Sequence, residues 1–137
     1  MNKKAIITIS SQQNNVEDSK IEVVSPGEFY RDKEVYCAEY DETEISGMEG
    51  TRTTLRFTTE KFTLLRVGTT NAEMNFEKNN NALTIYNTPY GVIEMKIETL
   101  DLKINVDEFG GDIFVKYNLI IGGEKPQNTI LKVNIKA

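Results

Sequence analysis

Apolar and polar residues alternate along most of this chain, with the two-residue period of a half-buried β-strand. The longest such stretch covers residues 92–106, where the apolar positions are odd-numbered up to Ile97 and even-numbered from Leu100 onward. One extra residue near Thr99 would produce this change of phase, and such a β-bulge bends a strand and increases its twist. We therefore predict a long, bent strand that serves two sides of a barrel.

The same alternation predicts further strands before and after the long one. They cover residues 5–9, 20–30, 34–41, 52–57, 62–67, 72–77, 83–87, 113–121 and 131–135. Polar or glycine-rich segments predict loops at 11–19, 43–51, 107–111 and 122–128. Pro26-Gly27 interrupts one extended segment, which suits an edge strand, a bulge or a sharp bend. Thr88-Pro89-Tyr90-Gly91 predicts a turn immediately before the long strand.

These elements predict an all-β protein, because no window has the pattern of a helix of ten or more residues. About eight to ten strands, mostly connected by hairpins, are typical of an antiparallel sandwich or barrel. We favour a closed antiparallel up-and-down barrel, since closure leaves no long strand edges exposed. With 137 residues, the whole chain (1–137) is expected to form a single domain.

Composition excludes several kinds of chemistry. The chain has no histidine, which removes Ser-His-Asp and Cys-His catalysis and any histidine metal site. We therefore expect a non-enzymatic protein without a cofactor or metal. The net charge is −5, with both signs interspersed, so we do not expect nucleic acid as a partner. The lone Cys37 is expected to be a small buried apolar residue in a reducing compartment.

The same composition predicts a cytoplasmic protein with no membrane association. No run of about 18 apolar residues is present, and the N-terminus lacks the apolar run and the small-residue cleavage site of a signal peptide. The oligomeric state stays open at this point.

Several short motifs together resemble the YwiB-like family of bacterial lipocalin-like β-barrel proteins. They are Tyr36-x3-Tyr40-x-Glu42, Thr53-Thr54-Leu55, Arg66-x-Gly68, Tyr86-x-Thr88-Pro89-Tyr90-Gly91, Thr99 and Tyr117-x-Leu119. Each motif is weak alone, whereas their order and spacing are specific over nearly the whole chain from about residue 20. One departure is Arg56, where lysine would be expected. The resemblance implies a calycin-type closed barrel and carries over no activity, cofactor or catalytic residue.

One polar cluster follows from the predicted topology. Strands that end at Asp41, Val67 and Asn87 would be alternate members of a meander, so their C-terminal ends would meet at one mouth of the barrel. The candidate site residues expected there, with Tyr117 from a later inward-facing row, are Tyr40, Glu42, Arg66, Tyr86, Tyr90 and Tyr117. Arg66 shares its predicted face with apolar residues, and a buried guanidinium needs a partner, for which Glu42 is the natural candidate.

Three interpretations of this cluster are open. The favoured interpretation is that Arg66 and Glu42 form a structural plug. The second is that they hold a small ligand, for which Arg66 suits an anion. The least favoured is that they are catalytic. The preferred function is a non-enzymatic barrel that binds a small ligand at its mouth or interior. The alternative is a structural or interaction module whose filled barrel binds a protein or RNA through its outer face. A reachable cavity of about 300 Å³ or more favours the first.

Weaker candidates lie elsewhere in the chain. Asp107, Glu108 and Asp112 surround two glycines, but their spacing does not match an EF-hand loop. Residues 122–126 lack the pattern of a phosphate loop. A strip formed by Arg52, Arg56 and Lys61 could meet RNA phosphates, although a solvated sheet face explains it better.

Overall fold

The computed structural model describes residues 2–13 and 20–137, which form strands and one short 3-10 helix. The strands are β1 (Lys3–Gln13), β2 (Ile21–Asp32), β3 (Val35–Asp41), β4 (Thr51–Phe57), β5 (Lys61–Gly68), β6 (Ala72–Glu77), β7 (Asn81–Thr88), β8 (Gly91–Asp107), β9 (Gly110–Ile121) and β10 (Gln127–Lys136). The 3-10 helix, η1 (Glu44–Ser46), lies between β3 and β4. Among these residues, no helix has the length and apolar character needed to cross a membrane.

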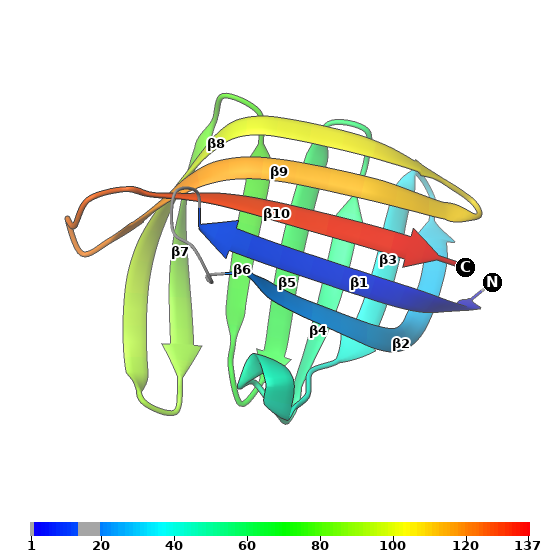
Figure 1. Ribbon diagram of the computed structural model, residues 1–137, viewed down its shortest axis with the longest axis horizontal. Coiled ribbons are helices and arrows are strands. Elements are labelled where there is room, and N and C mark those ends of the chain that lie inside the picture. The colour runs from blue at the N-terminus through cyan, green and yellow to red at the C-terminus, as the bar shows by residue number, and fades with distance from the viewer. Residues whose placement is uncertain (1, 14–19) are drawn as a thin grey trace.

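The strands form one antiparallel up-and-down barrel, which confirms the predicted fold class. Their order is β6-β5-β4-β3-β2-β1-β10-β9-β8-β7, so every pair of adjacent strands in the sheet is consecutive in sequence except β1 and β10. That pairing aligns Ile7 with Ile135 and joins the first strand to the last. Figure 1 shows the two ends of the chain side by side as a result.

The barrel is nearly closed, and its seam lies between β6 and β7. Asn71 and Asn87 exchange two backbone hydrogen bonds of 2.9 Å across it. Farther along, the Thr84 hydroxyl donates to the carbonyl of Glu73 at 3.0 Å, so a side chain takes the place of the backbone ladder. The seam therefore keeps β6 and β7 adjacent, as Figure 1 shows.

The predicted bulge in the long strand is confirmed. β8 has 17 residues, and its register with β9 shifts between Thr99 and Asp101. Leu100, the extra residue, is exposed. Beyond it, Leu102 pairs with Val115 and packs against the core, so the even-numbered apolar residues now face inward.

Deleting Leu100 is expected to lower the free energy of unfolding by at least ~3 kcal/mol. The deletion removes the phase change, so the half-buried Leu102, Ile104 and Val106 would turn to solvent. Each should lose roughly half of the 1.5–3 kcal/mol that a fully buried side chain contributes. Urea denaturation measures the loss. Leu100→Thr is the control, because it keeps the bulge and should stay within about 0.5 kcal/mol. Equal stability of the deletion variant and the wild type would contradict the role of the bulge.

Pro26-Gly27 marks a bend within a continuous strand. β3 pairs with β2 only from Glu28 onward, so the missing N–H of Pro26 leaves no gap in that ladder. At Gly27 the backbone of β3 comes very close, because a Cβ atom there would lie 2.2 Å from the carbonyl oxygen of Glu39. Glycine is therefore required where β2 turns from β1 toward β3.

The predicted loop at 11–19 was wrong for its first three residues. Ser11 to Gln13 continue β1 and pair with Leu131 to Thr129 of β10. Their polar side chains are tolerated because Gln13 donates to Gln127 at 2.9 Å, whereas Ser11 faces the barrel interior. Residues 14–19 lie outside the described residues.

The core is filled at one end of the barrel by aromatic side chains. Phe62 and Phe76 stack with ring centres 5.5 Å apart, and Tyr117 meets Phe76 edge-on at 5.0 Å. The alternation of burial along β4, β6 and β10 places every second side chain of these strands in the core. This packing leaves the other end of the interior free for the site described next.

Candidate functional site

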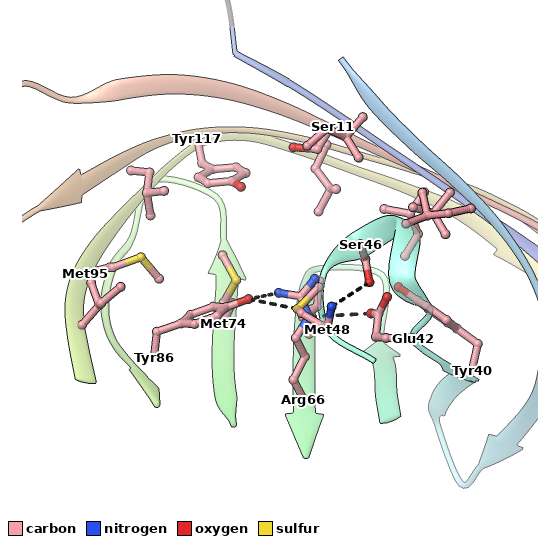
Figure 2. A pocket seen from close by; sticks show the side chains of 18 residues that line it. Ser11, Tyr40, Glu42, Ser46, Met48, Arg66, Met74, Tyr86, Met95 and Tyr117 are labelled. Carbon is pink, nitrogen blue, oxygen red and sulfur yellow. Dashed lines mark hydrogen bonds and ion pairs between the residues drawn. The ribbon is translucent and has the colours of Figure 1, made fainter. Parts of the chain in front are cut away.

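A cavity of about 410 Å³ opens at one end of the barrel and is lined in part by the segment that contains η1. The exposed side chains of Ile21 and Ile45 lie at its edge. Most of its walls are apolar. The apolar lining residues are Ile9, Ile21, Val23, Ile45, Met48, Leu64, Met74, Ile93, Met95, Leu119 and Leu131. The polar lining residues are Ser11, Tyr40, Glu42, Ser46, Arg66, Tyr86 and Tyr117. Figure 2 shows the labelled side chains converging on this space.

Five of the six predicted site residues line the cavity together. The ends of β3, β5 and β7 bring Tyr40, Arg66 and Tyr86 to one side, as the meander predicted. Tyr117 reaches the cavity from β9.

Tyr90 does not belong to this cluster, and its placement at the site was wrong. Its side chain is fully exposed at the tip of the turn between β7 and β8. The Thr88 hydroxyl accepts from the Tyr90 amide at 3.1 Å and donates to the carbonyl of Gly91 at 3.0 Å. These bonds tighten the turn, which directs the Tyr90 ring to solvent.

The centre of the polar cluster is a buried ion pair. Nε of Arg66 lies 3.8 Å from Oε2 of Glu42, and the two side chains are 14% and 2% exposed. The amide of Glu42 donates to the carbonyl of Thr51 at 2.8 Å, and its carboxylate accepts from the hydroxyl of Thr53. Glu42 is therefore fixed from two sides by β4, whereas its contact with Arg66 is long.

Arg66 keeps unused hydrogen-bonding capacity. Its Nη1 donates to the hydroxyl of Tyr86, which in turn donates to the sulfur of Met48 at 3.7 Å. Its Nε is buried and has no hydrogen-bond partner among the described residues. Burying a donor without a partner costs about 1–3 kcal/mol, so an acceptor that entered the cavity would gain a hydrogen bond from this Nε.

Two tyrosine hydroxyls also face the cavity in their neutral form. Burial, then the charge of Glu42, raises the pKa of Tyr40 well above its usual value of 10.0. Burial raises the pKa of Tyr117 to about 12, against a smaller lowering by Arg66. Figure 2 shows the hydroxyl of Tyr117 directed into the cavity.

The raised pKa of Tyr117 predicts a specific loss of stability in alkali. Its pKa is 10.0 when unfolded and about 12 when folded, so stability is unaffected below pH 10 and falls as the unfolded chain ionises first. Tyr117 alone should lower the free energy of unfolding by about 1.4 kcal/mol between pH 8 and pH 11. Urea denaturation of the wild type and of Tyr117→Phe measures this difference, with Tyr90→Phe as an exposed control. If the free energy of unfolding fell equally steeply with pH in the wild type and in Tyr117→Phe, the burial of this phenol would be contradicted.

Sequence reasoning missed the methionines and Thr53. Met48, Met74 and Met95, which are all the methionines after the first residue, line the cavity. The inward alternation of β6 and β8 placed two of them in the interior, but Met48 lies in an irregular segment with no such pattern. Thr53 is buried on the same face of β4 as Leu55, and only the fold shows that it donates to Glu42.

The weaker candidates gain no support as sites. No group of acidic or cysteine side chains suited to a metal ion occurs in residues 2–13 and 20–137. In the predicted basic strip, Arg52 is neutralised by Glu39 at 3.0 Å and Asp41 at 2.9 Å. Cys37 is buried, as predicted, and its burial raises its pKa.

A family model described as "Domain of unknown function (DUF1934)" matches residues 6–133. The chain belongs to this family. Among solved structures, the chain is similar to one titled "Crystal structure of ywiB protein from Bacillus subtilis", with a TM-score of 0.87 and 16% sequence identity. The match covers 99% of this chain and 92% of that one. A comparison with curated proteins finds no match. The predicted resemblance to YwiB-like barrels is thus confirmed, and it establishes the fold of this family member.

Proposed function

We propose that this protein binds a small amphipathic molecule inside the barrel and releases it unchanged. The observation that carries the proposal is the cavity of about 410 Å³, whose apolar walls surround the hydrogen-bonding groups of Arg66 and Tyr117. Ligand pockets typically combine mostly apolar walls with a few polar groups that fix orientation.

The polar groups indicate the kind of head group that the ligand carries. Nε of Arg66 is a buried donor without an acceptor among the described residues, and the hydroxyl of Tyr117 is a second donor in the cavity lining. A carboxylate suits both, since it accepts several hydrogen bonds and charge-assisted bonds to a guanidinium are the strong ones. We therefore favour a ligand with an anionic head over one with a cationic head.

The apolar walls indicate an unbranched or flexible body. Met48, Met74 and Met95 contribute long, polarisable side chains that adapt to irregular partners. The remaining walls are aliphatic residues such as Leu64 and Leu131, which offer no hydrogen bond. Such walls can accommodate a hydrocarbon chain, because it buries no polar group without a hydrogen bond.

Binding without catalysis, in the cytoplasm, is part of this proposal. Glu42 is the one carboxylate among the described lining residues, so a second acid for general acid–base chemistry is missing beside it. The alternative function, a filled barrel that acts only through its outer face, requires a packed interior. A cavity above roughly 300 Å³ favours ligand binding instead.

A head-group series tests the proposal. Decanoate, decanol and decylamine share one hydrocarbon chain and differ in charge. Calorimetric titration is expected to give binding in the order decanoate, decanol, decylamine, with at least about tenfold between the first and last, because an ammonium adds a second cation next to Arg66. Absence of binding by all three, or tightest binding of decylamine, would overturn the proposal.

A further inference from the structure

We propose that the cavity binds an anionic head group together with one proton, and that Glu42 is the residue that accepts this proton. The inference rests on the proposed function and adds a regulatory property to it, namely a dependence of affinity on pH. It follows from the balance of charges that the fold has buried around Arg66.

The charged side chains that line the cavity balance each other. Among its described lining residues, Arg66 is the one cation and Glu42 the one anion, and both side chains are largely withdrawn from water. A carboxylate that enters beside Arg66 would place two anions on one guanidinium. Two carboxylates that share a buried site do not both stay ionised, because their repulsion is poorly screened there.

Arg66 can pair with Glu42 or with a ligand carboxylate, because its contact with Glu42 is long. Its Nε lies 3.8 Å from the Glu42 carboxylate and makes no hydrogen bond among the described residues. A ligand carboxylate can take this donor without breaking an existing hydrogen bond. Glu42, once protonated, keeps the Thr53 hydroxyl as a neighbour and no longer repels the ligand.

The other titratable groups that face Glu42 across the cavity do not accept the proton that is taken up with the ligand. They are Tyr40 from β3, Arg66 from β5, Tyr86 from β7 and Tyr117 from β9. The guanidinium stays charged at all relevant pH values. Tyr40 and Tyr117 stay neutral because burial raises the pKa of both phenols. The remaining elements contribute apolar residues and serines to the lining, so the exchangeable proton belongs to the pair formed by Glu42 and the ligand.

The balance of the binding step is simple. The ligand enters as an anion, one proton comes from the buffer, and the cavity remains neutral overall. When both carboxylates are ionised in their free states, the affinity should therefore fall about tenfold for each unit of rising pH. A ligand with a neutral head adds no charge and should bind with no such dependence.

Calorimetric titration of decanoate at pH 6.5, 7.5 and 8.5, in phosphate and in Tris, tests the inference. These buffers differ in ionisation enthalpy, so the difference in binding heat counts protons. We expect uptake of about one proton by the wild type and none with decanol. Glu42→Gln should bind decanoate with no uptake and with affinity independent of pH. If this variant does not fold, the proton count of the wild type still decides whether a proton is taken up, and Glu42→Asp, which keeps the carboxylate, should retain the uptake.

Each outcome has a distinct meaning. Decanoate binding without proton uptake overturns this inference and leaves the proposed function standing. Uptake that persists unchanged in Glu42→Gln overturns the assignment to Glu42. If neither decanoate nor decanol binds, the proposed function fails, and the inference fails with it.

Discussion

Replacement of Arg66 with methionine is expected to lower the free energy of unfolding by about 3–5 kcal/mol and to abolish decanoate binding. The side chain of Glu42 is 2% exposed and faces Arg66, so the substitution leaves a buried carboxylate without a counter-charge. It also removes the donor proposed to hold the ligand head. Urea denaturation measures the first effect and calorimetric titration the second.

A double variant separates these two roles. Arg66→Met combined with Glu42→Gln removes both charges, so most of the lost stability should return, because a neutral pair carries no uncompensated charge. Decanoate binding should not return, since the cationic donor is still absent. Recovery of stability and binding together would contradict the role of Arg66 as the head-group ligand. Unchanged stability of Arg66→Met would contradict the pairing itself.

Filling the cavity is expected to weaken ligand binding at least 100-fold while the barrel stays folded. Met74 lines the cavity from β6 and is nearly buried, so Met74→Trp places an indole where the hydrocarbon chain is proposed to lie. Overpacking a filled core costs about 1–3 kcal/mol, and the free volume here should keep the loss at the low end. Titration with decanoate and urea denaturation measure the two quantities.

Met74→Leu is the matched control for this substitution. It conserves volume and apolar character, so stability should change by less than about 1.5 kcal/mol and decanoate should bind as in the wild type. If Met74→Trp bound decanoate as tightly as the wild type, the ligand would not occupy this cavity.

The barrel could be predicted from the sequence because strand alternation reports directly which side chains face inward. The phase change between Ile97 and Leu100 located the bulge to within one residue. The pairing of Arg66 with Glu42 was also predictable, since alternate strands of a meander end at the same mouth. The two-residue period and the direction of neighbouring strands are enough to predict both features.

The details of the site could not be obtained in this way, because they depend on three-dimensional geometry without a sequence period. Tyr90 is close in sequence to Tyr86, yet the turn bonds of Thr88 direct it to solvent. Met48 belongs to an irregular segment that folds over the cavity. Alternation predicts which residues face inward, but it does not predict whether their side chains fill the interior. The cavity of about 410 Å³ is therefore visible only in the three-dimensional structure.

Native mass spectrometry of the protein purified from its own host tests the central claim most directly. Under gentle conditions, we expect a species heavier than the bare chain by the mass of one small molecule, which should dissociate on collisional activation. The same species should be absent from Arg66→Met and Met74→Trp purified in parallel. A bare mass for the wild type under the gentlest conditions would contradict the account of this barrel as a ligand-binding protein.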